Sequence, residues 1–287
     1  MSQGPDLDAY CARLGVTIER VPTLTTLRTL LLAHVRAIPF ENLDVLLGRR
    51  IDLDPAAIEQ KLVQQCRGGY CFEQNALLLA VLQALGYDAT PLSARVRLQR
   101  PRDFTPPRTH MFVLVRLDGE RWLCDVGVGA LSPTAPLQLD VETPQATPHE
   151  PRRIVRHGSW ASGDRRSPDA RLFHQVQLGS DWQDVCEFTL EAMPEIDREV
   201  ANWFTSAHPQ SHFKNRLMAA RATADGRVTL LNRELTHRGR DGLGHTTIVR
   251  DEAHLLEVLA AEFGLHFPAD TRFPCPWIDW SAPAGPT

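Results

Sequence analysis

Arg67-Gly68-Gly69-Tyr70-Cys71-Phe72-Glu73-Gln74-Asn75 is the stretch on which the interpretation of this 287-residue chain depends. Two adjacent glycines let the backbone turn tightly, and the apolar residues from Phe72 to Leu85 predict a buried helix that ends at Gly86. Cys71 then falls at the start of this helix, where unpaired backbone N–H groups favour a thiolate. The stretch therefore predicts a nucleophilic Cys71. The alternative is a cysteine that simply packs where two helices meet.

The residues before this stretch have the patterning of helices. Apolar residues recur at helical spacing from Leu24 to Ile38, and Thr23 is a suitable N-cap. Asp54 followed by Pro55 predicts the start of another helix, which runs to the glycine pair. Residues 1–90 are therefore predicted to be mainly helical.

The middle of the chain has the patterning of strands. Several short strands at such spacing predict a small barrel or sandwich. The predicted strands are Thr90–Val96, His110–Leu117, Arg121–Val126, Leu172–Leu178 and Cys186–Glu191.

One predicted hairpin brings a histidine and an aspartate together. Asp118-Gly119 is typical of a two-residue turn, and counting back from it places His110 opposite Gly127. Asp125 lies two residues from Gly127, so it shares the face of His110 as a diagonal neighbour, with backbones roughly 7–8 Å apart. The pair can supply Cys71 with a base and an orienter. Taken singly, His110 can cap a strand end and Asp125 can be a turn residue, and a bulge would shift the register.

The segment Asp125-Val126-Gly127-Val128-Gly129 places two glycines directly after a strand. Such glycines expose backbone N–H groups that can receive a phosphate, although an ordinary turn has the same pattern. The spacing is not G-x-G-x-x-G and no βαβ unit surrounds it, which disfavours a dinucleotide-binding fold.

The last third mixes both kinds of element. Phe213–Ala220 is predicted to be helical, and Arg227–Leu231 and Glu234–Thr236 are predicted to be paired strands. A further helix begins after Asp251 and ends at Gly264.

Composition and charge disfavour several classes of function. The chain is 43% hydrophobic and 23% charged, as in folded soluble proteins, and its net charge of −4 gives no reason to expect a nucleic-acid partner. No apolar stretch approaches the roughly 18 residues that span a membrane, and the N-terminus does not resemble a signal peptide. We therefore expect a cytoplasmic protein without a membrane partner. A solvated loop is expected to carry Arg152, Arg153, Arg156, Arg165, Arg166 and Arg171.

The cysteines and histidines give no sign of a metal site. No C-x-x-C pair occurs, and no two histidines have the i, i+4 spacing with a glutamate that marks a metal-binding helix. A reducing compartment keeps scattered thiols free. The six cysteines are Cys11, Cys66, Cys71, Cys124, Cys186 and Cys275.

Taken together, these motifs resemble the arylamine N-acetyltransferases. The stretch around Cys71 matches their nucleophile motif throughout, Thr109-His110 resembles their histidine motif, and Asp125–Gly129 their aspartate motif. The resemblance spans roughly residues 7 to 267. Further matching positions are Pro39-Phe40-Glu41-Asn42-Leu43, Asp197, Asn202, Pro209, Ser211, Phe213 and Phe263-Gly264.

The resemblance implies an α+β fold of three domains. These are a helical domain over residues 1–90 that carries the nucleophile, a β-barrel over residues 91–205 that carries His110 and Asp125, and an α/β lid over residues 206–287. The implied triad of Cys71, His110 and Asp125 resembles that of transglutaminases and papain-like proteases.

The resemblance also implies a ping-pong reaction. Acetyl-coenzyme A, a co-substrate and not a permanently bound cofactor, acetylates Cys71, and an arylamine or arylhydrazine then takes the acetyl group. Thr109 and Gly127-Val128-Gly129 match positions near coenzyme A, and Phe40 and Val128 match positions that line the acceptor pocket. The family usually has phenylalanine at the place of Val128, so the preferred amine is open.

Three alternatives remain at this point. A cysteine hydrolase of transglutaminase type would have the same triad but would not need coenzyme A. An amide synthase that closes a ring on a polyketide is a specialisation within the same family. A non-catalytic binding protein on this fold would have no need of all three triad residues.

Overall fold

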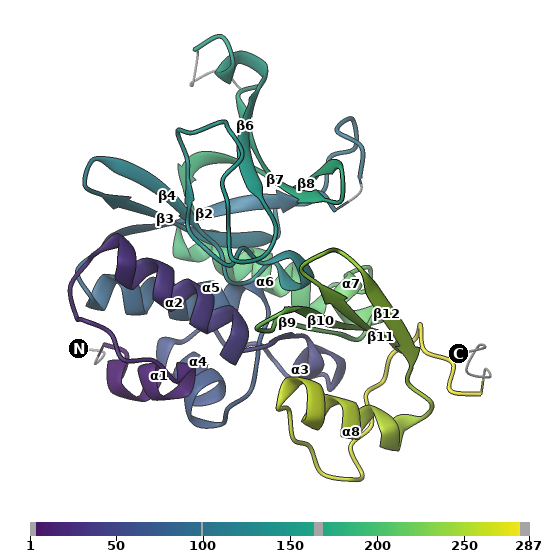
Figure 1. Ribbon diagram of the computed structural model, residues 1–287. Coiled ribbons are helices and arrows are strands. Elements are labelled where there is room, and N and C mark those ends of the chain that lie inside the picture. Colours follow the sequence, from purple (N-terminus) through teal and green to yellow (C-terminus); the bar gives the residue numbers. More distant parts are fainter. Residues whose placement is uncertain (1–3, 99, 164–168, 282–287) are drawn as a thin grey trace.

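Two long helices lie at the centre of the N-terminal third. The computed structural model describes residues 4–98, 100–163 and 169–281, and Figure 1 shows these helices below the barrel strands. Thr23 caps α2 (Leu24–Ala37), and α5 (Cys71–Ala84) begins at the cysteine, as the apolar spacing predicts. The shorter elements around them are α1 (Leu7–Leu14), α3 (Leu43–Leu46), α4 (Pro55–Glu59) and a π-helical turn (Gln60–Gln64).

Within the described residues, seven antiparallel strands form a sheet that curls into a nearly closed barrel (Figure 1). Their order is β5-β4-β3-β2-β8-β7-β6, so the edge strands β5 and β6 lie on either side of the gap. Short 3₁₀ turns follow β4 (Gly129–Leu131) and β6 (Gly158–Trp160). The strands are β2 (Asp88–Val96), β3 (His110–Leu117), β4 (Glu120–Cys124), β5 (Leu137–Gln138), β6 (Arg152–His157), β7 (Arg171–Leu178) and β8 (Asp181–Ala192).

Strand β3 is buried on both faces because the two faces pack against different partners. Met111, Val113 and Val115 belong to the same apolar cluster as helix α5. Phe112 and Leu114 belong to the cluster inside the barrel. This two-sided burial explains why β3 reads as a continuous apolar run in the sequence. It also packs the barrel directly against the helix that begins at Cys71.

The β3–β4 hairpin has the register predicted from its turn. Leu117 pairs with Glu120, and the ladder continues without a bulge to Val113 opposite Cys124. After Cys124 the chain leaves the strand, so Asp125 lies just beyond the end of β4. The predicted diagonal placement of Asp125 relative to His110 was counted from this register. Every residue of β4 has the predicted partner in β3.

A second sheet contains strands from both ends of the chain. Its order is β1-β9-β10-β11-β12, and α8 (Glu252–Phe263) packs against it, capped by Asp251 as predicted (Figure 1). The predicted helix over Phe213–Ala220 is wrong, because only the short α7 (His212–Asn215) forms before β9 begins. The strands are β1 (Phe40–Glu41), β9 (Met218–Ala222), β10 (Gly226–Leu231), β11 (Glu234–Gly239) and β12 (Gly244–Ile248).

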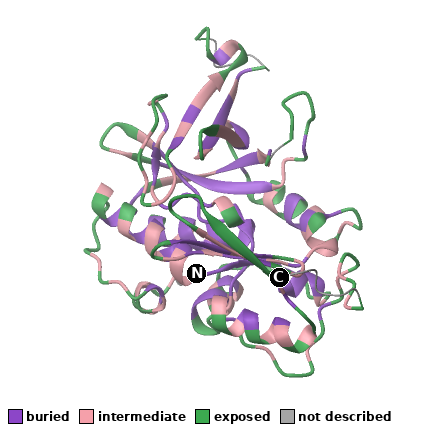
Figure 2. Cartoon of the chain, turned by 45° about the vertical axis from the view of Figure 1, so that its right-hand side comes forward, coloured by how far each residue is buried: buried purple, intermediate pink, exposed green. Residues whose placement is uncertain are grey.

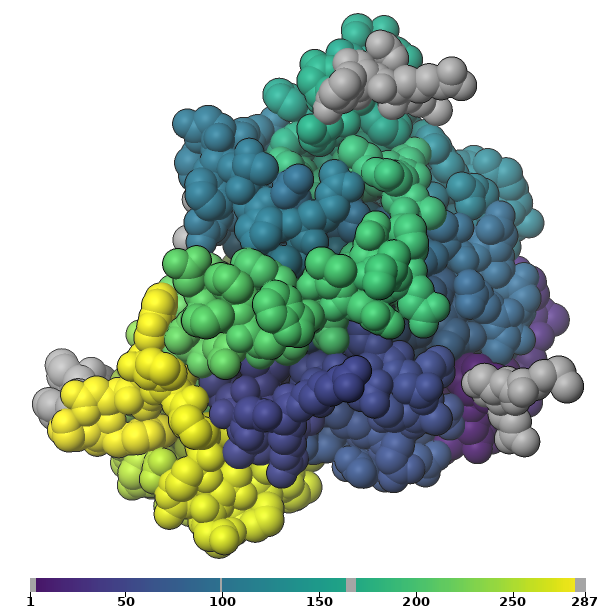
Figure 3. Space-filling view, turned by 180° about the vertical axis from the view of Figure 1, so that it is seen from behind, coloured from purple at the N-terminus to yellow at the C-terminus, as the bar shows by residue number. Residues whose placement is uncertain are grey.

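Helix α6 (Glu195–Ala207) connects the barrel to the second sheet and is not among the predicted helices. Viewed from behind, its green segment crosses the surface between the barrel and the N-terminal helices (Figure 3). The helix buries small and polar residues, including Ala201 and Asn202, while Ile196, Val200 and Trp203 are each 62% exposed. Its apolar periodicity therefore marks the outer face instead of the buried one.

Buried residues gather where the helices, barrel and second sheet meet, and exposed ones lie on the outer surfaces (Figure 2). The expectation of solvated arginines is wrong for Arg152, which is fully buried on β6. Its guanidinium contacts His174 Nε2 at 3.0 Å and Glu150 at 3.3 Å, because a buried charge needs partners. Arg165 and Arg166 lie outside the described residues. The division at 90/91 and 205/206 stays a prediction.

Candidate active site

Cys71 is the first residue of α5, and a buried acidic network supports the turn before it. Glu73 accepts a hydrogen bond from the Tyr70 backbone N–H at 3.0 Å, which satisfies one free donor at the helix start. Lys61 contacts the other oxygen of Glu73 at 2.6 Å. The Cys71 side chain is buried, and its thiol lies 3.6 Å from the Thr109 carbonyl oxygen, so the residue before β3 is a direct neighbour of the sulfur.

The structure brings His110 and Asp125 together as predicted. His110 Nε2 lies 2.7 Å from Asp125 Oδ2, and both side chains are almost completely buried. Burial by itself lowers the pKa of His110, but the Asp125 carboxylate opposes this and Cys71 also favours the charged ring, so that the pKa rises from 6.5 to about 10. The ring is therefore poised to carry a positive charge beside the Cys71 sulfur at neutral pH.

The carboxylate of Asp125 is kept ionised by its neighbours. Burial favours the neutral acid, but His110 outweighs this and lowers the pKa of Asp125 below its ordinary value. The backbone N–H of Gly127 donates to Oδ1 at 2.9 Å, and the Asn75 side chain donates to the same oxygen at 3.0 Å. Each oxygen of the buried carboxylate thus has its own hydrogen-bond partners.

Asn75 is a site residue to which the sequence analysis assigns no role. Its Nδ2 donates to the Met111 carbonyl at 2.7 Å as well as to Asp125, and its Oδ1 accepts from the Val126 N–H at 3.0 Å. Asn75 lies four residues after Cys71 on α5, so both side chains are on one face of the helix. That spacing is the signal that could have found it. The partner positions become clear only once the strands are placed.

The turn after β4 presses directly on the nucleophile. A Cβ atom on Gly127 would lie 2.7 Å from the Cys71 Cα and 2.6 Å from Asn75 Nδ2. The expectation that this turn offers free N–H groups to a phosphate is not met at Gly127, because Asp125 already accepts its hydrogen bond. Gly127 instead allows close contact between the turn and the start of α5.

Gly127→Ala is expected to lower the acetylation rate of Cys71 by roughly 10- to 100-fold, because the added methyl must displace the Cys71 backbone or the Asn75 amide. Overpacking of this kind also destabilises a fold by about 1–3 kcal/mol. Gly4→Ala is the matched control, since a Cβ there meets nothing within 4 Å. Acetylation followed by mass spectrometry, with thermal unfolding alongside, checks the result. Wild-type rates in Gly127→Ala would contradict the close packing.

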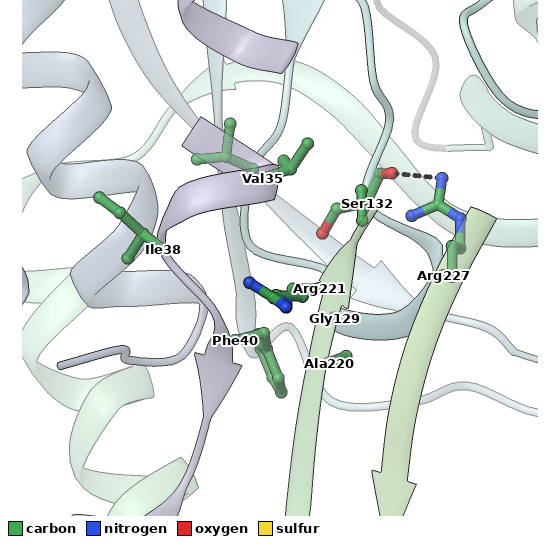
Figure 4. A pocket seen from close by; sticks show the side chains of 10 residues that line it. Val35, Ile38, Phe40, Gly129, Ser132, Ala220, Arg221 and Arg227 are labelled. Atoms are coloured by element: carbon green, nitrogen blue, oxygen red, sulfur yellow. Dashed lines mark hydrogen bonds between the residues drawn. The ribbon is translucent and has the colours of Figure 1, made fainter. Parts of the chain in front are cut away.

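Phe40 and Val128, the two residues matched to an acceptor pocket, lie in different apolar clusters. Val128 packs with Val176 and Val185 of the barrel. Phe40 belongs to the helical cluster, where its ring lies 3.3 Å from the position of a Cβ on Gly129. Figure 4 shows Phe40 beside strand β9 and Gly129, in the wall of a small pocket. The 126–129 turn therefore meets the Phe40 ring at Gly129, whereas Val128 of the same turn packs against the barrel.

Among the described residues no group of three or more His, Cys, Asp or Glu side chains is arranged to hold a metal ion. None of the described helices is long and apolar enough to span a membrane.

The arrangement at the start of α5 consists of the Cys71 thiol, the His110 ring and the Asp125 carboxylate, in that order. That set can transfer an acyl group through a covalent intermediate on sulfur.

Comparison with known proteins decides the family. A family model described as N-acetyltransferase matches residues 23–272. The arylamine N-acetyltransferase/N-hydroxyarylamine O-acetyltransferase of Salmonella typhimurium is 40% identical over 261 residues, which cover 90% of this chain and 88% of that protein. The chain belongs to the arylamine N-acetyltransferase family. It is therefore an acyltransferase.

Further members of the arylamine N-acetyltransferase family agree in sequence and in fold. The enzyme of Mycolicibacterium smegmatis is 40% identical over 91% of this chain and 92% of its own length. The structure of the Mycobacterium marinum enzyme in complex with CoA is 39% identical and superposes with a TM-score of 0.83, covering 90% of this chain and 92% of the other. The α+β architecture of helices, barrel and second sheet is thus the fold of this family.

Proposed function

We propose that this acyltransferase moves an acetyl group from acetyl-coenzyme A through Cys71 to the nitrogen of an arylamine or arylhydrazine. In the first step the Cys71 thiolate attacks the thioester carbonyl. The bond from the acetyl carbon to the coenzyme A sulfur breaks, and coenzyme A leaves with the proton that His110 has held. Coenzyme A itself supplies only the acyl group and the leaving thiol.

The second step runs the same machinery in reverse. The amine nitrogen attacks the acetyl group on Cys71, His110 removes a proton from that nitrogen, and the bond from carbon to the Cys71 sulfur breaks. Asp125 holds the imidazole ring and stabilises the imidazolium, which the first step consumes and the second step forms again. The observation that carries this mechanism is the 2.7 Å contact of His110 with Asp125, on a ring whose pKa Cys71 also raises.

The coenzyme A positions remain part of the proposal. Thr109 is supported by its place directly beside the Cys71 sulfur. In the segment Gly127-Val128-Gly129, the N–H of Gly127 is already used, so we propose that the backbone N–H groups of Val128 and Gly129 face the coenzyme, while the Val128 side chain belongs to the acceptor side. The relative from Mycobacterium marinum, whose structure contains CoA, supports coenzyme A as the donor. We place the reaction in the cytoplasm, where reducing conditions keep Cys71 free.

The test is a panel of aromatic amines and hydrazines assayed with acetyl-coenzyme A, with release of free coenzyme A as the readout. We expect release that depends on both substrates, with parallel initial-velocity lines, as ping-pong transfer requires. Continued release without any amine, beyond one coenzyme A per protein molecule, would instead identify a hydrolase. The absence of any release, with intact protein, would contradict the proposed function.

Val128→Phe is expected to change the choice of amine more than the first half-reaction, since acetylation of Cys71 does not involve the acceptor. A phenylalanine there is larger than the valine that packs with Val176 and Val185 and adds an aromatic face, which should raise selectivity for small arylamines over bulky ones. Differences of pocket fit are worth roughly 1–3 kcal/mol, or 10- to 200-fold. The measurement is kcat/KM for a small and a bulky amine on both proteins. Equal selectivity would remove Val128 from the acceptor site.

A further inference from the structure

A buried chain of three polar side chains runs from helix α1 to the turn before the nucleophile. His34 on α2 is completely buried, and both of its ring nitrogens have partners. The Tyr10 hydroxyl lies 2.7 Å from Nδ1, and the Gln74 Oε1 lies 2.6 Å from Nε2. Tyr10 and Gln74 are also buried, so each of these groups would be costly to leave unpaired.

The direction of this chain follows from its last link. Gln74 Nε2 lies 2.9 Å from the Pro39 carbonyl and 3.2 Å from the Gly69 carbonyl, and carbonyl oxygens only accept hydrogen bonds. The amide oxygen of Gln74 must therefore face His34, and His34 Nε2 must carry the proton. In a neutral ring Nδ1 then accepts from the Tyr10 hydroxyl. Burial lowers the pKa of His34 to about 4, in keeping with a neutral ring.

Gln74, at the end of this series of hydrogen bonds, contacts the two segments that lead to Phe40 and to Cys71. Pro39 precedes Phe40, and Gly69 precedes Tyr70 and Cys71. A parallel bridge joins Phe40 to Gly69, with the Gly69 N–H donating to Pro39 at 3.3 Å. The Gln74 amide holds the carbonyls on both sides of that bridge. Its own position on α5 is one turn below Cys71.

We propose that His34 is a positioning residue for the nucleophile: its neutral ring, protonated at Nε2, orients Gln74, which in turn fixes the turn that presents Cys71. This inference rests on the proposed role of Cys71. His34 does not touch the reacting atoms, and it acts only through Gln74. A loss of this link lets the turn shift, and a displacement of about 1 Å at a reacting centre can lower its rate on the order of 100-fold.

Two amide substitutions separate the links. His34→Gln places an amide N–H where Nε2 was and keeps the donor to Gln74, whereas His34→Asn reaches only the Nδ1 position and keeps the contact with Tyr10. The rate of Cys71 alkylation by iodoacetamide is measured per folded molecule. We expect His34→Gln to stay within about threefold of wild type and His34→Asn to fall by roughly 10- to 100-fold. Equal alkylation rates in the two variants would overturn the proposal.

A stability control distinguishes positioning from simple loss of core packing. Leu27→Ala on the same helix removes a fully buried side chain from the core and leaves Tyr10, His34 and Gln74 intact. It should lower the unfolding temperature without changing the alkylation rate of the folded protein. A fall in that rate matching the one in His34→Asn would mean that any destabilisation of α2 has the same effect, and positioning would be refuted.

The wild-type protein provides a test that needs no variant. Long-range ¹H–¹⁵N NMR spectra of the histidine rings, assigned through the loss of a signal in either His34 variant or by backbone correlation, report the protonated nitrogen. We expect a neutral His34 ring with its proton on Nε2 at neutral pH. A proton on Nδ1 would overturn the proposal. Neither the alkylation rate nor the NMR spectrum depends on acetyl-coenzyme A. A failure of acetyl transfer would therefore count against the proposed function without deciding the role of His34.

Discussion

Incubation with acetyl-coenzyme A alone is expected to add one acetyl group to the protein, on Cys71. The reason is the position of the thiol at the start of α5, where it interacts with the His110 ring that Asp125 contacts at 2.7 Å. Intact-mass analysis gives the number of groups, and peptide analysis gives the residue. Cys71→Ala should lose turnover on the order of 10⁶-fold, as expected when the nucleophile of a triad is removed.

The other cysteines provide the controls for this prediction. Burial raises the pKa of both Cys124 and Cys186 well above the ordinary value, so neither thiol forms a thiolate readily. Cys66 is exposed and close in sequence, which makes Cys66→Ser the matched variant, and it should acetylate like wild type. Labelling at Cys66 or Cys124, or efficient turnover by Cys71→Ala, would refute the assignment of the nucleophile.

Asp125→Asn is expected to keep the fold and lose roughly 10²- to 10⁴-fold in turnover. The asparagine has almost the same shape, but it lacks the charge that raises the pKa of His110 against the effect of burial. Without that charge, burial lowers the pKa of His110, and the ring loses the interaction that favours its protonated form. Asp118→Asn on the same hairpin is the control, because that exposed turn residue has φ 52, which asparagine also adopts. Turnover near wild type in Asp125→Asn would contradict the proposed role.

The same variant has a pH signature in stability. The folded-state pKa of His110 is about 10 and its ordinary value is 6.5, so the protonated ring stabilises the native protein fully below pH 6.5. This contribution decreases as the pH rises from 6.5 and is gone above about 10. In Asp125→Asn the decrease over this range should be absent or reversed. Thermal unfolding at closely spaced pH values from 6 to 10.5 measures it in both proteins.

The local parts of the site can be predicted from the sequence because they depend on short-range rules. The two-residue turn Asp118-Gly119 fixes the pairing of β3 and β4, and that pairing places Asp125 near His110. The glycine pair before Cys71 and the apolar run after it fix the start of α5. Each of these signals lies within about twenty residues of the feature that it determines.

The parts that could not be predicted depend on contacts between distant segments. Strand β9 forms between β1 and β10, and the partner of Ala220 is Phe40, far away in the chain. Asn75 gains its role only when Met111 and Asp125 arrive from the barrel. Helix α6 could not be predicted for a different reason. Its apolar residues Ile196 and Val200 face solvent, so their spacing does not mark a buried face.

The pairing of β1 with β9 has a consequence for how the protein is made. Phe40 emerges from the ribosome early, but its ladder partner Ala220 is added only after most of the chain has been synthesised. Glu41 likewise cannot pair before its partner Ala219 has been synthesised. Closing so long a loop is entropically unfavourable until many other contacts reward it, which slows folding. Cys71, His110 and Asp125 are therefore all synthesised before the strand that completes the ladder beside Phe40, and a chain that stops before β9 lacks the partner of β1.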